Sequence, residues 1–157
     1  DPIGTAMFFI TFLFGSFVFG WAKPVPVSPY YFKNRQKGMA LVGIAGPLTN
    51  FAVAIVFIVV LNALRLDSNS FVFTLFLLVF QVNMVLGIFN LIPVPPLDGS
   101  RVLGAFLSRD AYEKWVALDR YGMFIAIAVL MVVVWSGILR WVIVGLTELF
   151  LTNYVII

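Results

Sequence analysis

The sequence has 157 residues, of which 62% are hydrophobic and 11% are charged, and its formal net charge is +3. A soluble domain has roughly a quarter of its residues charged, so this composition excludes one. The sequence contains no Cys, which excludes disulfides and thiolate metal ligands, and it contains no His. The basic residues lie at the ends of apolar runs, which indicates orientation in a bilayer and excludes nucleic acid as a partner.

Four uncharged runs predict membrane-spanning helices, because each is long enough to cross the hydrocarbon with about 20 residues. We expect spans at about residues 3–22, 38–64, 70–92 and 121–139. Residues 141–156 are apolar but include Glu148, and they fit either a fifth span or a helix at the interface. The predicted fold class is all-α, a polytopic transmembrane helix bundle of four to five spans in one domain over residues 1–157.

Lys and Arg are concentrated in two of the three connecting segments, residues 23–37 and 98–120. Four successive spans place these two segments on the same side of the membrane, and cytoplasmic loops are enriched in Lys and Arg. We therefore expect both in the cytoplasm. Alternate prolines near residues 23–32 exclude a helix interior and favour a short extended or hairpin segment at the membrane surface.

The end of the third run carries the most informative pattern, a helix break followed by a carboxylate. Pro93, Pro95 and Pro96 interrupt the helix. Broken backbone at membrane depth is tolerated only where it is buried in protein or lines a wet cavity. Asp98 follows directly, and an acidic residue in this position is a functional candidate. The alternative is that Asp98 lies at the water interface and caps the next helix.

Two further polar features lie within the apolar runs. Asn90 precedes Asp98 by eight residues, and its amide must find partners inside the bundle. It fits either an interhelical hydrogen bond or a donor to a developing oxyanion. In the second run, Gly46 permits close backbone approach, Pro47 frees a carbonyl, and Asn50 lies one turn beyond Gly46. This group fits a packing contact equally well.

Three segments in order resemble the site-2 proteases, the M50 zinc intramembrane metallopeptidases, in their compact bacterial branch. They are FGWAKPVPV at residues 19–27, AGPLTN at 45–50 and NLIPVPPLDGSR at 90–101. The resemblance implies a metalloendopeptidase that cuts transmembrane protein or peptide substrates within the lipid bilayer. It implies a Zn²⁺ held by two histidines of an HExxH motif and by the aspartate of an LDG motif, which Asp98 matches.

The resemblance also implies roles for the neighbouring residues. Asn90 matches an asparagine proposed to steady the substrate backbone or the oxyanion. The turn that holds the ligand matches Pro95, Pro96, Leu97 and Gly99. A substrate-binding or packing segment matches Gly46, Pro47 and Asn50. The implied location is a bacterial cell membrane, with the active-site side facing the cytoplasm.

The sequence departs from the family pattern because, without His, it contains no HExxH. We expect that an amino-terminal part with this motif precedes Asp1, and that this chain alone neither binds Zn²⁺ tightly nor cleaves. Self-association through the groove left by the missing helix is a further expectation. One alternative is a catalytically inactive pseudoprotease that binds transmembrane helices. Another is a small transporter or channel component built on Asn50, Asn83 and Asn90, which no inverted repeat supports.

Overall fold

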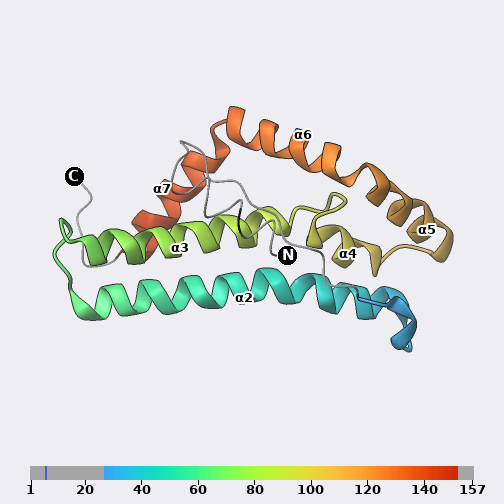
Figure 1. Ribbon diagram of the computed structural model, residues 1–157, viewed down its shortest axis with the longest axis horizontal. Helices are drawn as coiled ribbons and strands as arrows, with labels where there is room; N and C mark the ends of the chain where they lie inside the picture. The colour runs from blue at the N-terminus through green and yellow to red at the C-terminus, as the bar shows by residue number, and fades with distance from the viewer. Residues whose placement is uncertain (1–5, 7–26, 152–157) are drawn as a thin grey trace.

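The computed structural model describes residue 6 and residues 27–151, and this part of the chain contains helices and irregular segments but no strand. After a short 3₁₀ turn, η1 (Pro29–Tyr31), the elements are α2 (Arg35–Leu64), α3 (Phe71–Asn90), α4 (Asp98–Gly104), α5 (Arg109–Ala117), η2 (Leu118–Tyr121), α6 (Gly122–Trp135) and α7 (Ile138–Phe150). Figure 1 shows their arrangement. The all-α prediction is confirmed. The span predicted at residues 3–22 lies outside the described residues.

Three helical segments are long and apolar enough to cross a membrane: α2, α3 and the stretch Arg109–Trp135. Local chemistry sets the ends of the first two. The Asn34 side chain accepts a hydrogen bond from the Lys37 backbone N–H (3.1 Å), which caps α2. Arg65 adopts a left-handed conformation (φ 45°) where α2 ends. The Ser70 hydroxyl accepts from the Phe73 backbone N–H (3.1 Å) and caps α3.

The helices α2 and α3 pack side by side along their length, and α2 lies along one edge of the molecule (Figure 1). Their buried apolar side chains, together with one residue that follows α7, form the core: Ala54, Ile58, Leu61, Phe73, Phe80 and Leu151. Two amides attach α7 to this pair. The Asn62 side chain donates to the Phe150 carbonyl (2.8 Å), and the Gln81 side chain donates to the Thr147 hydroxyl (3.0 Å).

The helix α7 has 13 residues, so it is about 20 Å long and shorter than the hydrocarbon thickness of about 30 Å. It begins after Gly137, whose φ of 73° suits glycine and separates α7 from α6. Within the described residues, the predicted range 121–139 corresponds to α6, which ends at Trp135. The predicted range 141–156 corresponds to the part of α7 up to Phe150 and extends beyond the described residues.

Two connecting segments are more helical than the sequence indicated. Residues 98–120 were expected as a loop, but they contain α4, α5 and η2. In the segment predicted as extended or hairpin, Ser28 and Phe32 have extended backbone and flank the 3₁₀ turn η1. Residues 23–26 lie outside the described part of the chain. Short helices fit the positions of these segments, since a helix satisfies its own backbone hydrogen bonds close to the membrane.

Candidate active site

Asp98 is the first residue of α4 and follows the irregular turn of residues 91–97. Leu97 takes the N-cap position with extended backbone, and no side chain caps the helix. The half-buried Asp98 carboxylate has no hydrogen bond or ion pair with any residue that the structure describes. The helix-capping interpretation of Asp98 is therefore not what the structure shows, and the carboxylate is available to an additional group.

The carboxylate of Asp98 lies against α2 at Gly46. A methyl group built on Gly46 would lie 3.0 Å from Asp98 Oδ2, and one built on Gly43 would lie 2.8 Å from the Asp98 carbonyl oxygen. Both positions are open only because glycine has no side chain. The structure thus brings together Gly46 and Asp98, which belong to different sequence motifs 52 residues apart by their numbering.

The turn that precedes Asp98 is packed between the end of α3 and the start of α6. Gly99 is buried, and a side chain there would overlap the Leu91 carbonyl. Leu97 is also buried, and a methyl group on Gly122 would lie 2.9 Å from Pro96 Cβ. The second half of the proline-rich turn, from Pro95 to Leu97, is therefore packed against protein, while Pro93 is exposed.

The structure does not join the predicted asparagines to Asp98. Asn90 is the last residue of α3, and its neighbour Leu91 contacts Gly99, so Asn90 and Asp98 flank one backbone contact. Among the described residues, neither Asn90 nor Asn50 has a side-chain hydrogen-bond partner. Pro47 is fully buried within α2. Their roles with substrate remain predictions.

The surroundings of Asp98 act on its charge in two opposite ways. Burial raises the pKa of Asp98, and the nearby Arg101 guanidinium lowers it by a smaller amount. Across the described residues, no group of three His, Cys, Asp or Glu side chains is placed to hold a metal ion. A catalytic zinc needs three protein ligands, and the described residues offer one candidate ligand, Asp98. These residues do not by themselves fit a zinc site.

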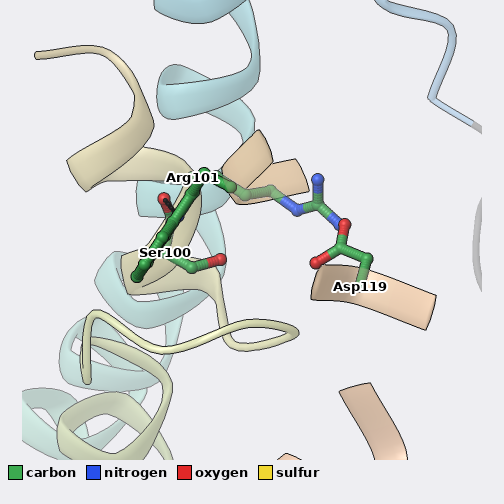
Figure 2. Close-up of polar contacts among 4 residues, drawn as sticks. Ser100, Arg101 and Asp119 are labelled. Atoms are coloured by element: carbon green, nitrogen blue, oxygen red, sulfur yellow. Dashed lines mark hydrogen bonds and ion pairs between the residues drawn. The ribbon is translucent and has the colours of Figure 1, made fainter. Parts of the chain in front are cut away.

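Three residues that the sequence analysis missed hold α4 in place. Figure 2 shows the Arg101 guanidinium directed at Asp119, with Nη2 and Oδ2 3.5 Å apart. The Trp115 indole N–H donates to the Ser100 carbonyl (3.0 Å). Gln36 Nε2 donates to the carbonyls of Gly104 (3.2 Å) and Leu107 (3.0 Å).

Trp115 and Asp119 reach α4 from residues 112–120, which the sequence analysis treated only as part of a segment rich in Lys and Arg. The available signal was Trp115 itself, since a partly buried indole N–H usually finds an acceptor. Nothing in the sequence pattern indicated that Gln36 would bind α4.

Comparison with known proteins gives matches that include this site. The profile of Peptidase family M50 matches residues 63–133, which contain α3, the turn and α4. The chain is 32% identical over 148 residues to "Putative zinc metalloprotease YwhC" of Bacillus subtilis, covering 90% of this chain and 64% of that protein. These matches support the resemblance of the chain to peptidase family M50. The resemblance noted from the three sequence segments is thereby confirmed.

A second relative comes from an archaeon. The chain is 42% identical over 79 residues to "Zinc metalloprotease MJ0392" of Methanocaldococcus jannaschii, covering 49% of this chain and 22% of that protein. The chain thus spans less than two thirds of the length of either relative. No solved structure matches it.

Proposed function

We propose that this chain contributes to an intramembrane zinc metalloendopeptidase of the site-2 type, in which Asp98 is a zinc ligand. One observation carries the proposal: the half-buried carboxylate of Asp98 has no hydrogen bond or ion pair among the described residues and lies against Gly46. Partial burial disfavours its charged form more than the nearby Arg101 favours it, and a bound cation would offset that cost. The names of the relatives support zinc as this cation.

In this proposal the remaining zinc ligands are the two histidines of an HExxH motif outside residues 1–157. The residues of this chain position one ligand. Gly46 and Gly43 allow α4 to approach α2 closely, and buried Gly99 fixes the start of α4 against the end of α3. Asn90, at that same helix end, would donate its amide to the substrate backbone or to the oxyanion.

The polar contacts of α4 support the proposed orientation in the membrane. The hydrogen bonds of Gln36 to Gly104 and Leu107 place the start of α2 beside the end of α4. The two segments rich in Lys and Arg therefore lie at one end of α2. We propose that this end faces the cytoplasm of a bacterial cell membrane, because cytoplasmic segments are enriched in basic residues. The substrates would be transmembrane proteins or peptides.

The test is Asp98→Ala in the full-length protein, assayed for cleavage of a membrane-embedded reporter peptide and for bound zinc. We expect cleavage to fall by more than about a hundredfold, because loss even of outer groups around a metal costs ten- to a hundredfold. Bound zinc should fall in parallel. Gly145→Ala is the matched control, since nothing lies within 4 Å of the added methyl group. Unchanged cleavage by Asp98→Ala would exclude the proposal.

A second candidate function is a pseudoprotease that binds transmembrane helices without cutting them. The absence of His from residues 1–157 favours it, because these residues contain no HExxH motif to supply the other zinc ligands. Zinc content and intact mass of the native protein separate the two candidates. A mass near 17.5 kDa without zinc supports the pseudoprotease. Chelator-sensitive cleavage by the complete protein contradicts it. The proposed self-association can be measured on the same sample by its mass in detergent.

A further inference from the structure

A pocket of about 520 Å³ opens between the start of α2 and the start of α5. Its volume lies within the range of about 300–1,000 Å³ that is typical of small-molecule sites. The residues that matter for its chemistry come from two segments about 70 positions apart in the sequence: Lys33, Arg35, Gln36, Arg109, Tyr112 and Glu113. The pocket is separate from Asp98 and has no part in the proposed proteolysis.

The charges of this pocket favour an anion. Three cations, Lys33, Arg35 and Arg109, line it together with one acid, Glu113. None of the three cations has an ion-pair partner among the residues that the structure describes. The Arg35 guanidinium lies 4.4 Å from the centre of the Tyr30 ring. Stacking on an aromatic face restrains the guanidinium and leaves its N–H groups free to donate.

The two walls of the pocket are fixed to one another. Gln36, from the α2 wall, donates to the carbonyls of Gly104 and Leu107 (3.2 and 3.0 Å). Tyr112, from the α5 wall, packs on Gly104, where an added methyl group would lie 2.9 Å from Tyr112 Cε2. Both walls thus contact the end of α4, which fixes the backbone on the two sides of an open surface pocket. Lys33, Arg35 and Arg109 are exposed at its rim.

Exposed aromatic side chains place the pocket at the level of the lipid headgroups. Tyr30 and Tyr31 are 76% and 90% exposed, and Phe106 is 83% exposed. Tyr30 lies beneath Arg35, and Phe106 precedes Leu107, whose carbonyl accepts from Gln36. Aromatic residues with one wet and one apolar side are typical of the membrane–water interface. The apolar part of α2 begins directly after this point.

We propose that this pocket binds the phosphate headgroup of an anionic phospholipid. Lys33, Arg35 and Arg109 would contact the phosphate oxygens, and the bound headgroup would hold the starts of α2 and α5 together. Arginine donors in a fork suit phosphate geometry, and the cations lie where anionic lipids are concentrated. In the native membrane a phospholipid of the bilayer would occupy the site, and no soluble ligand would be needed.

The test measures the thermal unfolding midpoint of the full chain in uncharged detergent during titration with short-chain phosphatidylglycerol. The double variant Lys33→Gln/Arg109→Gln should raise the half-saturating concentration about thirtyfold, since each charge-assisted hydrogen bond made directly to the phosphate contributes about fivefold. The matched control is Lys37→Gln/Lys114→Gln, which removes the same charge from the same two segments outside the pocket. It should stay within about twofold of the unsubstituted chain.

Glu113→Gln tests the proposal with the opposite sign and also serves if the double variant fails to fold. Glu113 is exposed, and its neutralisation should lower the half-saturating concentration about fivefold. Equal losses in the two double variants would indicate general surface charge and overturn the proposal. An equal shift produced by inorganic phosphate at the same concentration would indicate a soluble ligand and overturn the assignment to lipid. Short-chain phosphatidylcholine should produce no shift.

Discussion

The two halves of α2 are packed by different means. Its second half is packed by side-chain volume, with Ile58 and Leu61 buried against Phe73 and Phe80. In its first half, Gly43 and Gly46 have no side chain, and the backbone and the carboxylate of Asp98 in α4 therefore lie directly against the α2 backbone. Helices in lipid associate through close packing, without a hydrophobic drive between them. The comparison suggests that the first half tolerates no added atoms, while the second tolerates their loss at a cost in stability alone.

The largest expected effect is at Gly99 of α4, which allows close packing through the absence of a side chain, as Gly43 and Gly46 of α2 do. Gly99→Ala places a methyl group on the Leu91 carbonyl, with backbone on both sides, so the turn must move. We expect the free energy of unfolding to fall by about 3 kcal/mol, measured by denaturant titration in mixed micelles. In the control Gly145→Ala the methyl group meets nothing within 4 Å, and alanine favours the helix. Equal unfolding midpoints for the two variants would contradict the comparison.

An intermediate effect is expected in the region packed by side chains. Leu61→Ala removes a fully buried side chain and should lower the free energy of unfolding by about 2 kcal/mol. The loss lies at the low end for such truncations, because lipid is as apolar as leucine and mainly the cavity contributes. Specific cleavage activity of the full-length protein should not change. Leu64→Ala is the control, since Leu64 is 56% exposed and its loss leaves no cavity.

The difference between the regions also explains what the sequence could predict. Span positions and the helix break at Pro93 to Pro96 follow from local composition, and the helices α2 and α3 lie close to their predicted ranges. Asp98 was identified as a site candidate because a charge next to an apolar run is costly wherever the chain folds. Each of these features depends only on residues that are close together in the sequence.

The contacts around Asp98 could not be predicted in this way, because they join residues that are far apart. Gly46 was noted for its permissive backbone, but nothing in the sequence indicated that Asp98 would be the group admitted. The helices α4 and α5 were missed since residues 98–120 have no apolar run of span length. The pocket charges Lys33 and Arg109 were interpreted only as signs of orientation in the membrane.

The smallest expected effect concerns a polar contact of α4, and it tests whether charge or glycine packing holds α4 in place. The ion pair of Arg101 and Asp119 has a 3.5 Å separation, with side chains 29% and 31% exposed. In a double-mutant cycle with Arg101→Gln and Asp119→Asn, we expect a coupling energy of about 0.5 kcal/mol, decreasing as salt is added. A coupling above about 1.5 kcal/mol would mean that α4 is held mainly by charge and not by its glycine contacts.

The two hydrogen bonds of Gln36 have a consequence for the order of assembly. Their acceptors, Gly104 and Leu107, lie 68 and 71 residues later in the chain. Contacts between distant residues form after those between neighbours, so the hairpin of α2 and α3 can be complete before α4 exists. The two hydrogen bonds that join the start of α2 to the end of α4 are complete only after Leu107 has been synthesised. A shorter nascent chain contains Asp98 and its glycine contacts but lacks this second attachment of α4.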